Sequence, residues 1–401
     1  MITQAFINAK PIIDTFEKHG YEAYFVGGAV RDYLLGEPIG DIDIATNATP
    51  TETMSLFEKT VPVGVEHGTV LVLHGNDGYE VTTYRVESDY SDFRRPEAVT
   101  FVRSLVEDLA RRDFTINAIA MHPSEQLIDP YHGQVDLHNQ LINTVGHAEE
   151  RFSEDALRMM RAVRFCSQLN FTVTEAVKQA IKSQHHLLQN IAAERIQVEW
   201  FKLFAGKNVK QGLEILLETN MVESLPLLKE DHNVIQRLSD HVESSIEHHE
   251  VVLALSSLLS DSWTLSDWVK AYRCSNQQKR EANELIEAFK SYQTNGLTNQ
   301  LLYQLGRSRF PQFIQLLQQF DFYEGALEDF ESMYSQLPIH SRKDIAIEGN
   351  QLLNLRPDKR KGPWIGDYLQ LIEGMILSGE LSNQYEAIER QVKQWKEQEK
   401  D

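Results

Sequence analysis

The sequence predicts an α+β protein in which a small mixed α/β domain is followed by a long, all-helical region. Over about the first 145 residues, short apolar runs alternate with Gly-rich turns, which is typical of strands joined by tight turns. From about His147 onward, apolar residues recur with the 3.6-residue period of amphipathic helices. The length of 401 residues also favours several domains, roughly two to four.

The expected strands of the first domain are runs of mainly apolar residues that are bounded by turn residues. They are Tyr24 to Val26, Ile42 to Ala45, Gly68 to Leu73, Tyr79 to Tyr84 and Leu127 to Asp129. The helical region contains long amphipathic segments such as SEDALRMMRAVRFCSQL and AAERIQVEWFKLFAG. Helix-breaking residues divide this region near Gly206, Pro226, Gly296 and Pro338.

The composition is that of an ordinary globular protein, with 42% hydrophobic and 24% charged residues. No stretch reaches the roughly 20 apolar residues of a membrane span, and the first residues lack a signal-peptide pattern, so we expect a cytoplasmic protein without a membrane partner. Two cysteines, Cys166 and Cys274, support neither a disulfide framework nor a thiolate zinc site. The scattered histidines contain no His-Asp doublet, which argues against a phosphohydrolase.

A formal net charge of −20 argues against a nucleic-acid partner unless basic residues gather locally. One such segment is Asn354 to Trp364, near the C-terminus. We interpret it either as a solvated turn or as an RNA-binding patch made by Arg356, Lys359, Arg360 and Lys361.

A Gly-Gly turn follows the first expected strand. Gly27 and Gly28 let backbone N–H groups approach an anion, and Arg31 lies one turn into the helix expected next. A tight strand-to-helix turn with no ligand has the same pattern, so the turn alone is a weak signal.

Two carboxylates, Asp41 and Asp43, alternate with Ile42 and Ile44, so on a strand both acidic side chains point to one face. Carboxylate oxygens are ligands that Mg²⁺ prefers, and substrate phosphates complete its shell. Glu80, on another expected strand, is a third carboxylate for a site with two Mg²⁺ ions about 4 Å apart. A solvated strand edge is the alternative for each residue taken alone.

The combination resembles the nucleotidyltransferase superfamily that includes DNA polymerase beta, and within it the class II tRNA nucleotidyltransferases and their sister poly(A) polymerases. The resemblance is carried by blocks in the family's order and covers the first half of the chain best. The blocks are Gly27-Gly28-x-x-Arg31-Asp32, Asp41-x-Asp43, Arg111-Arg112-Asp113-Phe114-Thr115-x-Asn117-Ala118, Glu154-Asp155-x-x-Arg158-x-x-Arg161 and Ala193-Glu194-Arg195.

The resemblance implies a nucleotidyltransferase head over residues 1–145, a neck over 146–205, a helical body over 206–330 and a tRNA-binding tail over 331–401. It implies that Asp41 and Asp43 bind the metal, with Glu80 or Asp113 as the third carboxylate. It further implies nucleotide contacts from two parts of the chain: Gly28, Arg31 and Arg112 of the head, and Asp155, Arg158, Arg161 and Arg164 of the neck.

The neck residues have a pattern of their own. Asp155, Arg158, Arg161 and Arg164 are spaced by three, so on one helix they form a drifting charged stripe in which neighbours touch. Ion pairs on a helix surface are the alternative interpretation. An ionised Asp accepts and an Arg donates, so Asp155 and Arg158 fit the amino group and ring nitrogen that cytosine and adenine share.

The expected reaction is attack by the 3′-hydroxyl of tRNA on the α-phosphate of CTP or ATP, which releases pyrophosphate. Arg111 and Arg112 precede an apolar run and would offset charge on the pyrophosphate. The segment Glu87 to Pro96 resembles the flexible loop of enzymes that add the whole CCA end. A poly(A) polymerase, a partial CC- or A-adding enzyme and a noncatalytic RNA-binding protein are the alternatives.

Overall fold

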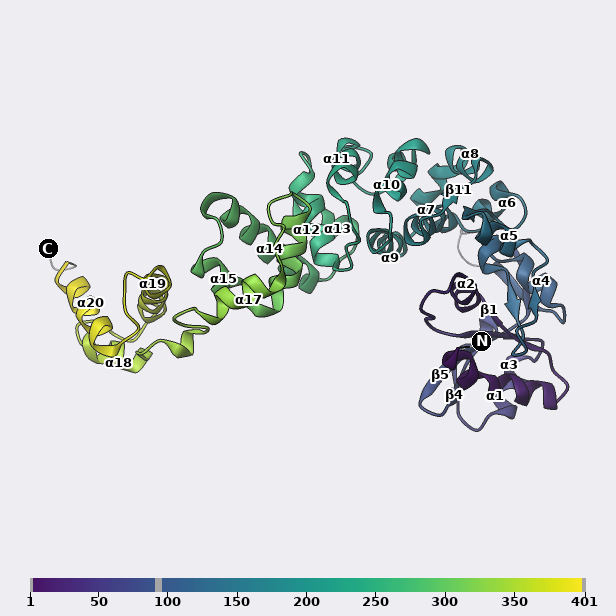
Figure 1. The fold of residues 1–401 in the computed structure, drawn as a ribbon, viewed down its shortest axis with the longest axis horizontal. Coiled ribbons are helices and arrows are strands. Elements are labelled where there is room, and N and C mark those ends of the chain that lie inside the picture. Colours follow the sequence, from purple (N-terminus) through teal and green to yellow (C-terminus); the bar gives the residue numbers. More distant parts are fainter. Residues whose placement is uncertain (1–2, 91–95, 399–401) are drawn as a thin grey trace. The chain divides into compact units, whose positions relative to one another are not determined.

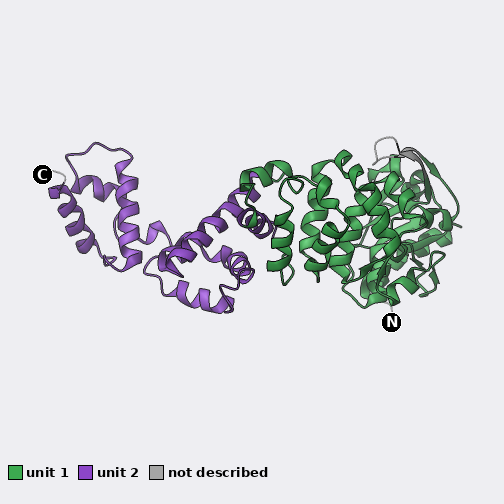
Figure 2. Cartoon of the chain, turned by 90° about the horizontal axis from the view of Figure 1, so that it is seen from above, with its two compact units in different colours: residues 1–247, 259–274 green, residues 248–258, 275–401 purple. Residues whose placement is uncertain are grey.

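The computed structural model describes residues 3–90 and 96–398. Its contacts divide the chain into two compact units, coloured separately in Figure 2. Unit 1 comprises residues 1–247 and 259–274, and unit 2 comprises residues 248–258 and 275–401. All of the sheet lies in unit 1 among the described residues, whereas unit 2 is helical, so the α+β prediction is confirmed.

A seven-stranded sheet forms the centre of the head (Figure 1). The five expected strands are present within a few residues of their predicted bounds. Strands β2 and β5 pair in parallel, and the other neighbours pair antiparallel. In spatial order the strands are β3 (Thr60–Gly64), β4 (Thr69–His74), β5 (Asp77–Thr83), β2 (Asp43–Thr46), β1 (Ala23–Val26), β8 (Ala120–Met121) and β9 (Leu127–Ile128).

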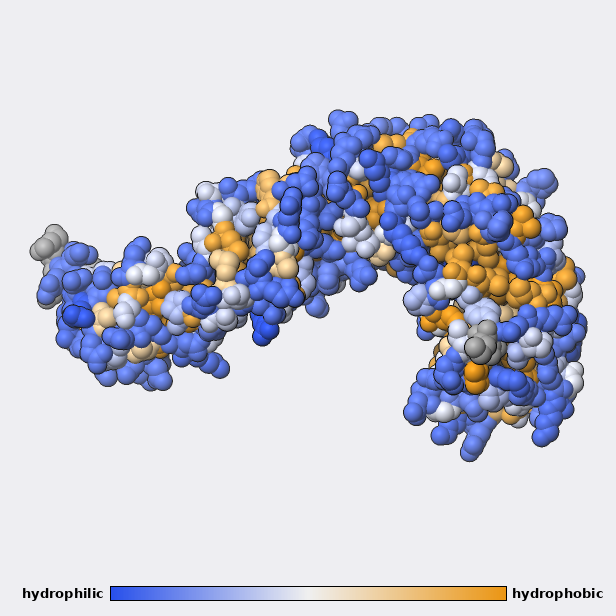
Figure 3. All heavy atoms as spheres, in the orientation of Figure 1, coloured by the Kyte–Doolittle hydropathy of each residue, from blue (hydrophilic) through white to orange (hydrophobic). Residues whose placement is uncertain are grey.

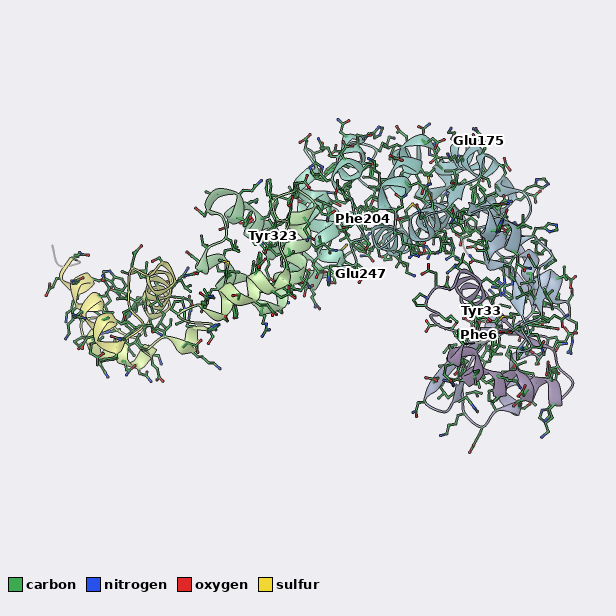
Figure 4. All side chains as sticks on the ribbon, in the orientation of Figure 1. Phe6, Tyr33, Glu175, Phe204, Glu247 and Tyr323 are labelled. Atoms are coloured by element: carbon green, nitrogen blue, oxygen red, sulfur yellow. The ribbon has the colours of Figure 1, made fainter. Side chains whose placement is uncertain are left out.

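Helices of the head pack through apolar faces at helical spacing. In α1 these residues include Phe6, Ile12 and Phe16, all fully buried. Phe6 contacts the rings of Phe25 on β1 and Tyr33 on α2, with centroids 4.7 and 5.5 Å apart, and so joins both helices to the sheet (Figure 4). The helices are α1 (Gln4–Lys18), α2 (Gly28–Leu35), α3 (Pro50–Leu56), α4 (Leu105–Ala110) and α5 (Gly133–His138).

A separate two-stranded hairpin, β6 (Arg85–Tyr90) and β7 (Pro96–Phe101), continues from β5. The segment Glu87 to Pro96, which was expected to be a flexible loop, includes the end of β6 and the first residue of β7. Residues 91–95 of that loop lie outside the described residues.

The helices after the head pack on one another within unit 1, and α6 packs on α8. Helix α7 packs on α9 and α10, and Gly206 lets the chain pass close to α7, because a Cβ there would lie 2.0 Å from Oγ of Ser167. The elements are α6 (Ala148–Glu154), α7 (Leu157–Leu169), α8 (Glu175–Gln184), α9 (Ala193–Phe204), α10 (Val209–Glu218), α11 (Asn233–His241) and α13 (Leu265–Ala271), with a short parallel pair of β10 (Leu141–Ile142) and β11 (Thr172–Val173).

Unit 2 consists of helices, and aromatic residues fill part of its core. The rings of Phe310 and Phe330 meet edge to face with centroids 5.4 Å apart. Its helices are α14 (Asn276–Asn295), α15 (Asn299–Leu305), α16 (Phe310–Gln318), α17 (Leu327–Ser335), α18 (Gly349–Leu355), α19 (Trp364–Ser378) and α20 (Tyr385–Gln398), and most of α12 (His249–Leu259).

No helix in the described ranges is long and apolar enough to cross a membrane. The face of the molecule drawn in Figure 3 is mostly hydrophilic, with apolar side chains showing between the charged ones.

Candidate functional site

A cavity of about 700 Å³ opens in unit 1 between the sheet of the head and the first helices of the neck. Nine of the predicted site residues line it, although they come from segments far apart in the chain. They are Gly28, Arg31, Asp43, Glu80, Arg112, Asp155, Arg158, Arg161 and Arg164. Asp41 is the one predicted pocket residue that does not line the cavity: it is exposed and lies two residues before Asp43.

The glycine turn forms one wall of this cavity. Gly27 has a φ of +73°, and a Cβ there would lie 3.3 Å from Nη1 of Arg112 and 3.4 Å from Oδ2 of Asp43. Only glycine meets both conditions without strain. Helix α2 begins at the next residue, so its N-terminal N–H groups and positive dipole end lie at the cavity, an arrangement that favours an anion.

Two carboxylates meet at the floor of the cavity. Asp43 is the first residue of β2, and the parallel register pairs it directly with Glu80 on β5. Burial raises the pKa of Asp43 to about 6; the nearby Arg112 opposes this shift, and the charges of Glu80 and Asp41 add to it. The surroundings therefore disfavour the charged form of Asp43, mainly because it is buried.

The predicted strand through Asp41 and Asp43 is shorter than expected. Strand β2 begins only at Asp43, and Asp41 precedes it in an irregular segment. The alternation itself holds, because Ile42 and Ile44 are buried while Asp41 is exposed and Asp43 is half-buried.

Asp108 of α4 holds the two adjacent arginines, a role that the sequence did not reveal. Its fully buried carboxylate pairs with Nη2 of Arg111 at 2.9 Å and with Nη2 of Arg112 at 3.4 Å. Arg112 also donates to the backbone oxygen of Asn117 at 3.4 Å, and burial lowers the pKa of Arg112. Arg112 is thereby held between Asp108 and the carboxylates of the floor.

Asp113, the other candidate for the third carboxylate, is engaged by protein groups. Arg161 donates to Oδ2 from Nε at 2.6 Å, and Asn117 and the amide of Phe114 donate to Oδ1. Burial alone would raise the pKa of Asp113, but Arg161, Arg158 and these hydrogen bonds hold it well below its usual range. Its carboxylate therefore positions Arg161, which leaves Glu80 as the carboxylate beside Asp43.

One aromatic ring organises three arginines of the cavity. The guanidinium carbons of Arg164, Arg31 and Arg161 lie 3.9, 5.1 and 5.4 Å from the ring centroid of Phe165. Contact with the face of an aromatic ring offsets part of the cost of burying a guanidinium. Arg164 also pairs with Glu199 at 2.6 Å, and burial lowers the pKa of Arg164 to about 10.

The expected stripe of Asp155 and the neck arginines on one helix is wrong for Asp155. Helix α6 ends at Glu154, and Asp155 has extended backbone angles of −137° and 103° before α7 begins at Leu157. The Asp155 carboxylate is therefore not a same-helix neighbour of Arg158. It accepts two bonds from Arg195 of α9, at 3.2 and 2.7 Å.

Arg158 is held in the cavity wall by other groups. It is 9% exposed, pairs with Glu154 and donates to the backbone oxygens of Arg151 and Arg111 at 3.1 and 3.0 Å. Arg195 was noted in the sequence as part of a motif, but its spacing gave no sign that it reaches Asp155.

A further set of lining residues was not predicted at all. His67 lines the cavity from the turn before β4, Thr69 from β4, Thr82 from β5 and Arg85 from the start of β6. Periodicity alone places these residues on strands or turns, and only the order of the strands brings them beside Glu80.

In unit 2 the predicted basic surface is smaller than expected. Arg356 is only 2% exposed, and it pairs with Asp358 at 2.9 Å and donates to the hydroxyl of Tyr368. The prediction that Arg356 belongs to an exposed basic patch is therefore wrong. Lys359 is half-buried near the rings of Trp364 and Tyr368, and Arg360 and Lys361 are exposed.

Family models match most of the chain in three segments. Residues 23–143 match a poly A polymerase head domain, residues 170–231 a probable RNA and SrmB-binding site of polymerase A, and residues 244–392 a putative tRNA nucleotidyltransferase domain 2.

Individual relatives match the chain from end to end. A CCA-adding enzyme of Oceanobacillus iheyensis is 44% identical over 395 residues, which cover 98% of both chains. A CCA-adding enzyme of Enterococcus faecalis is 42% identical over 96% of this chain and 95% of its own. The crystal structure of the Bacillus stearothermophilus CCA-adding enzyme in complex with CTP superposes with a TM-score of 0.87 at 35% identity, covering 100% of this chain and 99% of the other.

Proposed function

The chain belongs to the family of CCA-adding enzymes and adds nucleotides from CTP and ATP to the 3′ end of tRNA. We propose that the head cavity performs this reaction through Asp43 and Glu80, which line it, together with the predicted ligand Asp41, which lies just outside the lining and acts on Asp43 through its charge. The observation that carries this assignment is the pairing of Asp43 with Glu80 on adjacent parallel strands, beside a glycine turn and a cluster of arginines. Each of these features alone has an ordinary structural explanation. Together in one cavity they fit a nucleoside triphosphate and its counterions.

The carboxylates are suited to a divalent cation. The raised pKa of Asp43 reflects burial together with neighbouring carboxylate charge, and a bound cation would relieve both. Across the described ranges, no group of three or more acidic, histidine or cysteine side chains is arranged to hold a metal ion, so Asp43 and Glu80 would supply only part of a shell. Water and substrate phosphates would have to supply the remaining ligands, as they commonly do for Mg²⁺. When bound, such ions favour ionisation of the attacking hydroxyl and neutralise phosphate charge.

The triphosphate would lie along the glycine turn and the arginine cluster. The N-terminus of α2 offers backbone N–H groups, and Arg31, Arg161 and Arg164 are held around Phe165 at the same wall. Arg112, fixed by Asp108, lies beside Asp43. These cations offset the charge that develops on the departing pyrophosphate.

Asp155 and Arg158 would select the base. The bonds from Arg195 hold the Asp155 carboxylate, an acceptor group, in the cavity wall, and the donor groups of Arg158 lie in the same wall. Cytosine and adenine both present an amino donor beside a ring-nitrogen acceptor, which complements this pair. Uracil and guanine present the reverse order and would leave buried groups unpaired.

Sequencing the products of one incubation tests the assignment. The substrate is a tRNA that ends at its discriminator base, supplied with Mg²⁺, CTP and ATP. We expect termination after C, C and A. A run of A residues would indicate the poly(A) polymerase alternative, addition that stops after CC or requires a CC end would indicate a partial enzyme, and no addition would indicate a noncatalytic protein.

A further inference from the structure

The cavity has a second side, lined from β4, β5 and the turn before β4, beyond the residues that we propose for the nucleotide. We propose that His67, Thr69 and Thr82 bind the terminal ribose and phosphate of the tRNA, and so position its 3′-hydroxyl for attack. This proposal rests on the proposed function, because it assumes that the same cavity transfers nucleotides.

The order of the strands separates the two sides. The glycine turn follows β1, Asp43 lies on the neighbouring β2, and Glu80 lies on β5 beyond it. Thr82 is two residues after Glu80 on the same face of β5, and it pairs with Thr69 on β4. The carboxylates therefore lie between the phosphate-binding turn and the two threonines.

The reaction needs such a division. In phosphoryl transfer the attacking and leaving oxygens lie on opposite sides of the phosphorus, roughly in line. Arg31, Arg161 and Arg164 would hold the pyrophosphate on the side of α2. The acceptor hydroxyl then has to approach from the side of β5 and β4, where Thr82 and Thr69 line the cavity.

The side chains there suit the end of an RNA strand. The hydroxyls of Thr69 and Thr82 lie 3.1 Å apart and share one hydrogen bond, so they keep donor and acceptor capacity for the hydroxyls of a ribose. His67 is exposed at the cavity, and no hydrogen bond is recorded for its imidazole within residues 3–90 and 96–398. An imidazole N–H is a donor for a phosphate oxygen.

The backbone fixes His67 at this position. Arg85 donates to the carbonyl of His67, and the next carbonyl, that of Gly68, accepts the amide of Thr83 at 2.9 Å. Gly68 has a φ of +88°, and a Cβ there would lie 3.0 Å from the ring of Phe101. The turn before β4 is therefore held on both flanks, which favours a positioned group over a loose surface side chain.

Apolar side chains continue the same face beyond the threonines. Leu71 is the register partner of Glu80, Val61 on β3 is the partner of Leu71, and Val61 is 41% exposed. Directly opposed residues of an antiparallel pair share a face. A nucleobase whose ribose contacts the threonines would have an apolar surface to rest on.

Steady-state kinetics on the full chain tests this with His67→Ala and Thr82→Val. We expect KM for tRNA to rise about tenfold in each variant, while KM for CTP changes less than twofold. His74→Ala, at the far end of β4, and Thr60→Val, on β3, are matched controls outside the cavity, and we expect neither to change KM for tRNA. A rise in KM for CTP instead of tRNA would overturn the proposal.

A primer that ends in a 2′-deoxyribose gives a readout that a folding defect does not imitate. If Thr82 contacts the terminal ribose, removal of the 2′-hydroxyl slows the wild type but adds little to the loss in Thr82→Val, and Thr82→Ser behaves like the wild type. Fully additive losses would contradict the contact. If the wild type itself incorporates no CTP, the proposed function fails rather than this subsite.

Discussion

The cavity of unit 1 and the basic segment of unit 2 both place arginines beside aspartates, yet their charges are arranged in opposite ways. In the cavity, burial and neighbouring carboxylates raise the pKa of Asp43 to about 6. In the tail, a hydrogen bond from Arg356 lowers the pKa of Asp358 to about 2. The carboxylate of the tail is stabilised by its own arginine, whereas at Asp43 the effect of burial exceeds that of the nearby Arg112. Clustered charge thus indicates a ligand site only where the surroundings oppose that charge.

Removing the proposed metal-binding carboxylate should give the largest difference between the two regions. We expect Asp43→Asn to slow addition of both C and A on the order of a thousandfold or more, because the proposed metal site would serve both. Asp358→Asn should leave the rate within about threefold, because Asp358 belongs to unit 2 and does not line the cavity. Single-turnover kinetics measure both, and tRNA affinity is the control. If Asp43→Asn loses tRNA affinity to the same extent, the variant is misfolded.

Base selection should respond to the neck residues with an intermediate effect. We expect Asp155→Ala and Arg158→Ala to lower the preference for CTP over UTP by about 10- to 100-fold, since each wrongly paired group costs about 1 to 3 kcal/mol. Arg195→Ala should act in the same direction and more weakly, because it frees the Asp155 carboxylate without removing it. Competition assays with mixed nucleotides measure the ratio. If Asp155→Ala and Arg158→Ala lose rate but keep the preference, selection lies elsewhere in the cavity.

The contributions of Asp43 and Asp358 to the free energy of unfolding should change with pH in opposite directions. The raised pKa of Asp43 means that its contribution is complete below pH 3.8 and is lost as the pH rises through about 6. In metal-free buffer at pH 8, Asp43→Asn should therefore melt roughly a few degrees above the wild type, and the two should converge near pH 4. The contribution of Asp358 runs the other way, because it is lost only as the pH falls towards 2. Equal melting temperatures for the wild type and Asp43→Asn from pH 4 to 8 would show that folding does not raise the pKa of Asp43.

The smallest effect concerns the tail. Replacing Lys359, Arg360 and Lys361 with alanine should weaken tRNA binding several-fold and flatten its salt dependence, because fewer phosphate contacts release fewer counterions. Arg356→Ala should instead lower the melting temperature of unit 2 without changing the salt slope, since Arg356 is buried. An identical salt slope for the triple variant would assign the patch to a solvated turn.

Much of the head could be read from the sequence because its signals are local. Alternating burial placed Ile42 and Ile44 in the core, and the double glycine marked the start of α2. The sequence predicted that Asp43 and Glu80 share a site, but not that they are register partners. Parallel pairing depends on the order of the strands and not on residue spacing.

The errors arose where tertiary contacts override local spacing. A three-residue interval predicted Asp155 and Arg158 on one helix, but Asp155 accepts from Arg195 across 40 residues and the helix is interrupted there. Arg356 lies in a run of basic residues, yet it is buried, because it pairs with Asp358 and donates to the hydroxyl of Tyr368. Neither partner can be identified from the composition of the segment alone.

The ring of Phe165, in the neck, contacts arginines from both the neck and the head. Arg31 belongs to the head, and Arg161 and Arg164 belong to the same helix as the ring, so a hinge motion that separated α2 from α7 would strip one guanidinium from a shared support. A cation over an aromatic face contributes about 0.5 to 2 kcal/mol. Replacing the Phe165 ring with an aliphatic side chain is therefore expected to weaken the contact of Arg31 with α7 by about that amount.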